Sequence, residues 1–461
     1  MNGVYRPLLL TFFSALGRLA GFEPPVFRLA SLVLHASTAF LFFLLAQQLF
    51  RLSSLAAATA ALVFLLHPLQ TTNLAIAWKQ SDLWVSLLSL SSLLLWNHKK
   101  GIVPALFLFL LALGFKETAL MMPFLWLATE PLRGPEGRSS RITAGVAGAV
   151  TGTIFFLFLP ALVRPSSTPG SFPGSGWSYF LTQLGVYPYY LRDLLWPPNL
   201  TIDRTIPLAS SLSVSLFLSL AIVSSLLAGL IAGTVRKNAA AISILLAAIC
   251  FLPSSSLHPL SLLYDETRLY LALGFLSIGL VKLILSVLPD ERIRPVLRVS
   301  LSASLALLLL VSGRLGTFRW RSEEALWASA LAVDPTSLRA HYQLGYLAQK
   351  ARALDDAERE FRNALDLNPK FPNARLHLGI VLGQKGDLDG AAREFRQLLS
   401  AEPYWASQAH FYLGLNAVYR RDFAQAKEEF ATVRNFSPGS VEAERGEAIL
   451  NRTRAYATLR K

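Results

Sequence analysis

The sequence predicts an all-α fold in two parts, a polytopic transmembrane helical bundle followed by a soluble helical repeat. Of the 461 residues, 53% are hydrophobic and only 16% are charged, which is too apolar for an ordinary soluble protein of this size. Long apolar stretches run from Phe27 to Gly313, and charged helices with a 34-residue period follow. We therefore expect a membrane domain at 1–313 and a repeat domain at 314–461.

The charge of the chain fits a membrane protein better than a nucleic-acid-binding one. Its formal net charge of +14 is spread over many loops without a long Lys/Arg run, as the positive-inside bias of membrane proteins produces. We expect no nucleic-acid partner. Cys250 is the only cysteine, so no intramolecular disulfide and no cysteine-based zinc site is expected. The first 26 residues lack the arrangement of a cleavable signal peptide.

The apolar stretches predict about ten membrane spans, because crossing a ~30 Å hydrocarbon core takes roughly 20 apolar residues. The expected spans are 27–49, 54–67, 83–97, 102–114, 118–130, 142–163, 211–233, 239–257, 269–289 and 296–313.

The stretch 102–130 is either a hairpin or one interrupted helix. His98-Lys99-Lys100 precede it and Arg133 follows it. Since both clusters are cytoplasmic under the positive-inside rule, the chain between them crosses an even number of times. This favours a hairpin with Lys116 and Glu117 at its outer tip. The same topology puts the repeats on the extracytoplasmic side.

The repeat has the spacing of tetratricopeptide units. A Leu-Gly pair recurs at Leu344, Leu378 and Leu413, followed at fixed distances by an Ala (Ala357, Ala391, Ala426), a Phe (Phe361, Phe395, Phe430) and a Pro (Pro369, Pro403, Pro438). Small residues mark the contact of two antiparallel helices. We expect a half unit at 320–337, repeats at 338–371, 372–405 and 407–440, and a capping helix at 441–461. Such an array has a concave face that suits an acceptor or partner protein.

Four polar segments lie in the expected outer loops: His67–Thr71 with Trp78–Asp82, Phe115–Thr118, Tyr187–Arg192 with Trp196, and Tyr264–Tyr270. Ionisable residues beside membrane spans are candidates for function. Each segment also has a structural interpretation. His67-Pro68 can end a helix, Lys116 and Glu117 can pair with each other, the aromatic stretch can be an interfacial belt, and Arg268 can be a snorkelling anchor.

In this order, and with the repeats, the segments resemble those of the transmembrane and tetratricopeptide-repeat O-mannosyltransferases, which are C-type glycosyltransferases, and their bacterial relatives. The resemblance implies a membrane enzyme, such as one in the bacterial inner membrane, that moves a sugar from a polyprenyl-phosphate donor to a protein hydroxyl. The lipid-linked sugar is a substrate, and neither a cofactor nor a metal is expected.

The resemblance also implies roles for individual residues. The donor phosphate needs cations, for which Arg is well suited by its bidentate geometry; the candidates are Arg268, Lys116 and Lys79. Sugar or acceptor positioning is expected of His67, Gln70 and Glu117, and contact with lipid or the interface of Tyr187, Tyr189, Tyr190, Arg192 and Trp196.

One departure concerns the catalytic acid. Members of that family begin with a further helix and a loop carrying an acidic residue, whereas no Asp or Glu precedes Glu23 here. The chain is thus expected to lack its first helix, or to be a protein without catalysis, and no catalytic residue is assigned. The alternative function is a membrane-anchored repeat scaffold that recruits envelope proteins; a transporter is the weaker third class.

Overall fold

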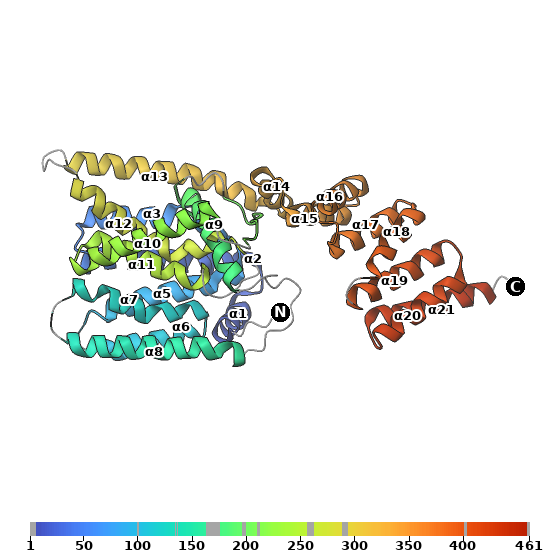
Figure 1. Ribbon diagram of the computed structural model, residues 1–461, viewed down its shortest axis with the longest axis horizontal. Helices are drawn as coiled ribbons and strands as arrows, with labels where there is room; N and C mark the ends of the chain where they lie inside the picture. Colours follow the sequence, from blue (N-terminus) through green and yellow to red (C-terminus); the bar gives the residue numbers. More distant parts are fainter. Residues whose placement is uncertain are drawn as a thin grey trace. The chain divides into compact units, whose positions relative to one another are not determined.

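The computed structural model describes residues 6–98, 101–133, 135, 137–162, 176–195, 200–209, 213–255, 262–287, 294–400 and 403–458. Over these residues the chain is helical, and no strand occurs among them (Figure 1). It forms two compact units. The first comprises 1–202 and 206–320, and the second comprises 203–205 and 321–461.

The first unit contains thirteen described α-helices with short 3₁₀ turns between some of them. The helices are α1 (Pro7–Ala20), α2 (Pro24–Gln48), α3 (Ser54–Leu66), α4 (Thr71–Ala75), α5 (Gln80–Leu95), α6 (Ile102–Leu113), α7 (Met122–Thr129), α8 (Arg138–Leu162), α9 (Gly176–Leu195), α10 (Val214–Val235), α11 (Ala239–Ser255), α12 (Tyr270–Val287) and α13 (Arg294–Phe318). The 3₁₀ turns are η1 (Pro68–Gln70), η2 (Ala77–Lys79), η3 (Glu117–Met121), η4 (Glu130–Leu132), η6 (Glu266–Leu269) and η7 (Arg319–Arg321), the last of which extends one residue past this unit.

The helix boundaries follow local chemistry. Ser53 caps α3 by accepting from the backbone N–H of Ala56, which satisfies one of the free donors at the helix start. The same helix ends at Leu66 because His67 precedes a proline and therefore adopts an extended conformation (ψ 129°). The polar segment that begins at His67 is thus a break between helices.

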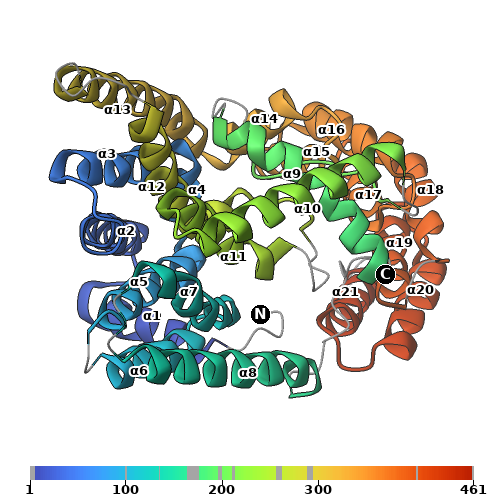
Figure 2. The same ribbon diagram turned by 60° about the vertical axis from the view of Figure 1, so that its left-hand side comes forward.

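Apolar packing joins the helices of this unit. α2 packs on α3 and α5, α3 on α12 and α13, and α11 on α12; Figure 2 shows α3, α12 and α13 on one side and α5 to α8 on the other. Phe42 lies with its ring 4.8 Å from Phe64 and 5.3 Å from Phe275. A Cβ at Gly274 would lie 2.0 Å from the Phe42 ring, so a glycine there lets α2 and α12 approach closely.

The expectation of about ten spans is not met. Three described helices are long and apolar enough to cross a membrane, namely Pro24–Gln48, Leu216–Val235 and Glu266–Ser286, and a fourth span arises if the bent pair Ser54–Leu66 and Pro68–Ala75 is counted as one. Several other helices, such as α5 with 16 residues and α6 with 12, are shorter than the roughly 20 residues that a span requires. The expected spans 142–163, 211–233, 239–257 and 269–289 also include residues outside those described.

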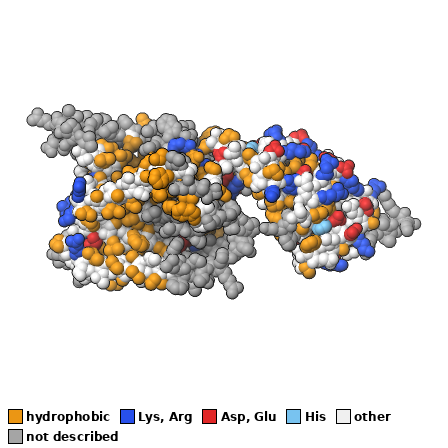
Figure 3. Space-filling model, in the orientation of Figure 1, with side chains coloured by type: hydrophobic (Ala, Val, Ile, Leu, Met, Phe, Trp, Pro, Cys, Tyr) orange, Lys and Arg blue, Asp and Glu red, His pale blue; other side chains and the backbone are white. Residues whose placement is uncertain are grey.

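The surface of this unit is nevertheless strongly apolar. Hydrophobic side chains cover much of the face seen in Figure 3, and Phe217, Ile222 and Leu226 of α10 are each more than half exposed. Exposed apolar area on this scale marks a surface for lipid or for another protein.

The stretch 102–130 forms two helices, and a residue before the first contacts a residue after the second. Lys116, between α6 and η3, is fully extended (φ −165°, ψ 144°). Asn97 precedes α6, and Arg133 follows α7. The Arg133 guanidinium donates a hydrogen bond to the Asn97 side chain at 3.0 Å. An out-and-back path of this kind agrees with the hairpin and not with one interrupted helix. Buried Glu130 fastens the same end by accepting from Arg141 at 2.9 Å.

The second unit is a row of antiparallel helix pairs. Its helices are α14 (Glu323–Val333), α15 (Leu338–Lys350), α16 (Leu354–Leu367), α17 (Pro372–Gln384), α18 (Leu388–Leu398), α19 (Pro403–Tyr419), α20 (Phe423–Phe436) and α21 (Val441–Thr458). The pairs α15–α16, α17–α18 and α19–α20 pack most closely. Residues 203–205 belong to this unit, since the Ser337 hydroxyl donates to the Asp203 carboxylate at 2.6 Å.

The repeated Leu-Gly and Phe positions meet inside each pair. A Cβ at the second residue of each Leu-Gly pair would lie 2.5 to 2.8 Å from a ring carbon of the Phe in the next helix; the pairs are Gly345–Phe361, Gly379–Phe395 and Gly414–Phe430. Each pair also carries a contact of 2.7 Å between a histidine or arginine nitrogen and a glutamate oxygen at one equivalent position: His341–Glu360, Arg375–Glu394 and His410–Glu429. The sequence period is therefore a structural period.

Candidate functional site

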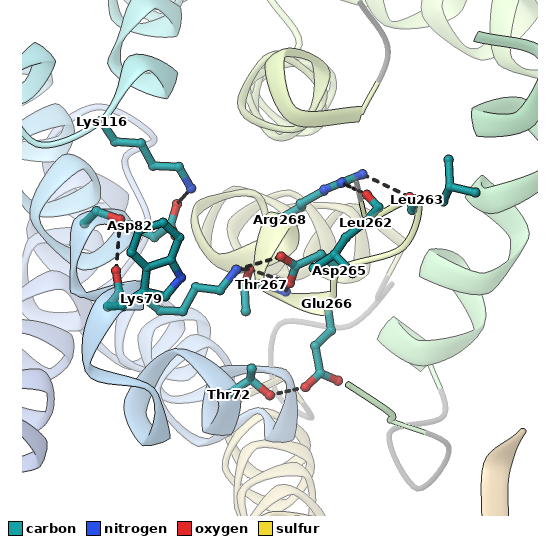
Figure 4. A network of polar contacts seen from close by, with 12 residues as sticks. Thr72, Lys79, Asp82, Lys116, Leu262, Leu263, Asp265, Glu266, Thr267 and Arg268 are labelled. Atoms are coloured by element: carbon teal, nitrogen blue, oxygen red, sulfur yellow. Dashed lines mark hydrogen bonds and ion pairs between the residues drawn. The ribbon is translucent and has the colours of Figure 1, made fainter. Parts of the chain in front are cut away.

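Three polar segments that are far apart in the sequence meet in the first unit. They are the stretch from His67 to Asp82, the break at Lys116 and Glu117, and η6 with the residues on either side of it. Figure 4 shows their side chains turned toward one another across helix ends. The structure therefore brings together residues from three of the four polar segments that the sequence singled out.

Lys116 and Asp82 form the first contact of the cluster. Nζ of Lys116 lies 2.6 Å from Oδ1 of Asp82, and the two side chains are 16% and 15% exposed (Figure 4). Oδ2 of Asp82 is buried and has no hydrogen-bond partner among the residues that the structure describes. The pair is therefore reachable from solvent at its edge and retains one unused acceptor.

Lys79 is held by the segment that starts η6. Its Nζ lies 2.6 Å from Oδ2 of Asp265 and 2.8 Å from the hydroxyl of Thr267. Oδ1 of Asp265 accepts from the Thr267 backbone N–H at 3.0 Å, so this aspartate also caps the turn. Burial alone raises the pKa of Asp265, but the charges of Lys79 and Arg268 and the hydrogen bonds outweigh it and lower that pKa to about 2. Asp265 is therefore ionised at neutral pH.

Arg268 differs from the two lysines in its partners. Its guanidinium donates to the backbone carbonyls of Leu263, at 3.1 Å, and Leu262 (Figure 4). Among the described side chains, no carboxylate lies within ion-pair distance of it. A guanidinium has five N–H donors, and two carbonyls leave some of them unused. Tyr190 and Asp265 also interact with this guanidinium, but among the described residues Arg268 is the cation of the cluster that no carboxylate contacts directly.

Glu266 lies between these residues and turns to the other side of η6. Oε1 of Glu266 accepts from Arg319 at 2.7 Å and from the hydroxyl of Thr72. Both charged side chains are buried, with 1% and 6% exposed. Sequence analysis named neither Arg319 nor Thr72, and it did not separate the role of Glu266 from that of Arg268.

His67 and Gln70 are bound to the backbone. Nε2 of His67 lies 3.1 Å from the carbonyl oxygen of Leu194, and Nδ1 accepts from the backbone N–H of Leu69 at 3.2 Å. These contacts fix the neutral tautomer with the proton on Nε2. The amide of Gln70 donates to the carbonyl of Tyr270 at 3.4 Å, while its Oε1 is buried and has no partner among the described residues. The geometry therefore gives His67 a structural role and leaves Gln70 one free acceptor.

Glu117 lies at the edge of the cluster. It is 40% exposed and contacts the guanidinium of Arg6 at 3.5 Å. Arg6 in turn donates to Ser81 at 3.3 Å and lies 4.6 Å from the centre of the Trp78 ring. These contacts tie the start of α1 to the site. Arg6 is not among the site residues predicted from the sequence.

Part of the aromatic stretch packs directly behind Asp265. The Tyr190 ring stacks on Tyr264 at 4.9 Å, and the Tyr190 hydroxyl accepts from the backbone N–H of Asp265 at 3.1 Å. Burial raises the pKa of Tyr190 to about 12, so its hydroxyl stays neutral.

The rest of the aromatic stretch has other partners. Tyr187 packs on Phe251 with ring centres 5.8 Å apart. The guanidinium of Arg192 lies 5.5 Å from the centre of the Tyr189 ring. Trp196 lies outside the described residues.

The residues that sequence reasoning missed are the acidic partners of the cations. Asp82 follows Lys79 by three residues, and Asp265 stands directly before Glu266. Acidic residues so close to basic ones at the ends of apolar stretches are a signal that could have pointed to ion pairs. Among the described residues, no group of three or more His, Cys, Asp or Glu side chains comes together that could hold a metal ion.

Comparison with known proteins gives one informative similarity. No protein-family model matches the chain. A protein O-mannosyl-transferase of Caenorhabditis elegans is 24% identical over 371 residues, which cover 78% of this chain and 53% of that protein. The chain thus spans about half the length of this curated relative.

A solved structure of yeast Tom70 aligns over 92% of this chain and 97% of its own, with 11% identity and a TM-score of 0.28. A score this low does not define a shared fold, and no argument rests on it.

Proposed function

We propose that this chain is a membrane glycosyltransferase that moves a sugar from a polyprenyl-phosphate donor to a protein hydroxyl at the extracytoplasmic face. The sugar is mannose if the chain shares the substrate named for its nematode relative. The repeats bind the acceptor polypeptide, and the reaction takes place in the bacterial inner membrane. Helices long enough to span a membrane, and the exposed apolar side chains of α10, support the membrane location.

The observation that carries the proposal is that one cluster contains Lys79, Lys116 and Arg268, with the Arg268 guanidinium turned toward Leu262 and Leu263 (Figure 4). Each lysine already has an aspartate partner. The two Lys–Asp pairs therefore present no net positive charge to a phosphate. Arg268 adds a positive charge that donates to two backbone carbonyls and interacts with Tyr190 and Asp265, with no carboxylate among the described residues at ion-pair distance. An arginine with unused N–H groups suits the two oxygens of a phosphodiester.

The chemistry needs stabilisation of the leaving phosphate. The acceptor oxygen forms a bond to the anomeric carbon, the bond from that carbon to the phosphate oxygen breaks, and the hydroxyl proton goes to a base. Cations held in a partly dehydrated site stabilise the charge that develops on the leaving oxygen. No base is assigned.

The test uses the full chain reconstituted in lipid nanodiscs with a radiolabelled polyprenyl-phosphate mannose and a Ser/Thr-rich acceptor polypeptide. Arg268→Ala should abolish transfer and also weaken binding of polyprenyl phosphate, the product lipid, measured by native mass spectrometry. Arg314→Ala, on the exposed side of α13, is the matched control and should retain both.

Lipid binding separates the possible results. Loss of transfer with unchanged lipid binding would remove Arg268 from the phosphate site. If the wild-type chain transfers no sugar and binds no polyprenyl phosphate, the glycosyltransferase proposal is wrong, and the scaffold function gains by comparison.

A further inference from the structure

The carboxylate of Glu266 is held by two segments far from it in sequence. Oε1 lies 2.7 Å from a terminal nitrogen of Arg319 and accepts a hydrogen bond from Thr72. The same nitrogen of Arg319 lies 3.2 Å from the Thr71 hydroxyl and 3.1 Å from that of Thr72. One guanidinium therefore joins η6 to α4.

Glu266 is flanked by the two residues that hold Lys79. Asp265 and Thr267 both contact Nζ of Lys79, and Arg268 follows one residue later. Asp265 caps η6, while Glu266, Thr267 and Arg268 lie within it, so the short hydrogen-bonded turn links the backbones of these residues. A shift of Glu266 would therefore change the place of Lys79 and Arg268.

The ion pair of Glu266 and Arg319 has features that stability alone does not explain. Nε and one terminal nitrogen of Arg319 and Oε2 of Glu266 are buried and have no hydrogen-bond partner among the described residues. Buried, unsatisfied polar atoms cost free energy, and a buried ion pair is by itself weak support for a fold. Features of this kind gather where function requires a fixed geometry.

Arg319 also stands next to the repeats in the chain. It follows α13 directly, and the repeat unit resumes two residues later at Arg321. The segment that leads into the repeats thus contributes a side chain to the cluster of the first unit.

We propose that Arg319 is a positioning residue. Through Glu266 it holds η6 in the conformation in which Lys79 and Arg268 bind the donor. The inference rests on the proposed function, but its first readout does not depend on turnover.

The experiment compares four versions of the full chain in lipid nanodiscs: Arg319→Met, Arg319→Lys, the double variant Arg319→Met/Glu266→Gln, and the control Arg314→Met on an exposed position of α13. The first readout is the rate at which an amine-reactive reagent labels Lys79, followed by mass spectrometry. The second is transfer from polyprenyl-phosphate mannose, with kcat and KM separated.

Arg319→Met should raise Lys79 labelling severalfold and lower kcat/KM by about a hundredfold, as small displacements of binding groups do; Arg319→Lys should restore part of both. The double variant removes both buried charges, so its Tm should return close to that of the wild type while labelling stays high. Arg314→Met should match the wild type.

Two results would overturn the inference. One is unchanged Lys79 labelling in Arg319→Met. The other is a double variant that recovers normal labelling together with its Tm, which a merely structural role predicts. If the wild type transfers no sugar, the proposed function fails, whereas the labelling result still decides whether Arg319 positions Lys79.

Discussion

Nζ of Lys116 lies 2.6 Å from Oδ1 of Asp82, and this contact joins the break before η3 to the first turn of α5. About one sixth of each side chain is exposed, so neither charge is fully hydrated. The contact therefore holds together two segments that are 34 residues apart in the sequence.

The first prediction concerns this pair. Lys116→Met leaves the Asp82 carboxylate without its cation in a largely buried position, which should cost about 2–4 kcal/mol of unfolding free energy. The double variant Lys116→Met/Asp82→Asn should recover most of the loss, because no unpaired charge remains. Thermal unfolding of the solubilised full chain measures both.

A surface ion pair of the repeats provides the control. Lys385 contacts Asp355, which is 91% exposed, and Glu358. Lys385→Met should change the unfolding free energy much less than Lys116→Met does, since solvent screens exposed pairs. A loss in Lys116→Met no larger than in this control would contradict the prediction.

Much of the fold could be predicted from the sequence because its signals are local. The Leu-Gly, Ala and Phe positions of the repeats predict helix pairs, and Gly379 does meet Phe395 in the structure. The number of membrane spans could not be predicted from such local signals. Apolar composition does not reveal where a helix ends, and the breaks at His67 and Lys116 divide apolar stretches into helices too short to span a membrane alone.

The candidate site was predictable in its segments but not in its pairings. Lys79, Lys116 and Arg268 are conspicuous as charges beside apolar stretches. Which partners they meet depends on contacts between residues up to 186 positions apart, as for Lys79 and Asp265. Arg319 was missed for the same reason, since nothing near it in sequence indicates that its partner is Glu266.

The second prediction is a pH dependence of stability. The pKa of Asp265 is about 2 in the folded chain and about 3.9 in an unfolded one. A lowered folded-state pKa gives stability that is fully present above the unfolded value and is lost as the pH falls toward the folded value. Asp265 should therefore contribute about 2–3 kcal/mol at pH 6, decreasing between about pH 4 and pH 2.

Unfolding of the wild type and Asp265→Asn across this range tests the effect. The difference in their Tm should be largest above pH 5 and should shrink as the pH is lowered to 3. A difference that stays constant over the whole range would show that the carboxylate charge is not its source.

The third prediction separates structure from catalysis at His67. Both ring nitrogens contact the backbone, at Leu194 and Leu69, so His67→Ala removes two hydrogen bonds and should lower the unfolding free energy by about 1–3 kcal/mol. His67→Asn keeps an acceptor for the Leu69 N–H and should lose less stability.

The activity of the same variants is expected to change little. In transfer assays at a temperature where both variants are folded, kcat should stay within about threefold of the wild type. A hundredfold loss of kcat in a fully folded variant would instead assign His67 to the reaction.

The last prediction uses two glycines of α17 that differ only in their surroundings. A Cβ at Gly379 would lie 2.5 Å from a ring carbon of Phe395, whereas a Cβ at Gly383 would lie 3.8 Å from Ala391, an ordinary contact. At either position, replacing glycine by alanine should stabilise the helix by about 1 kcal/mol, because alanine has the higher helix propensity. At Gly379 the clash outweighs this gain and should leave a net loss of about 1–3 kcal/mol, while Gly383→Ala should be neutral or stabilising. Circular dichroism of the full chain during thermal unfolding distinguishes the two, and equal shifts would mean that the close approach of α17 and α18 does not limit residue size at Gly379.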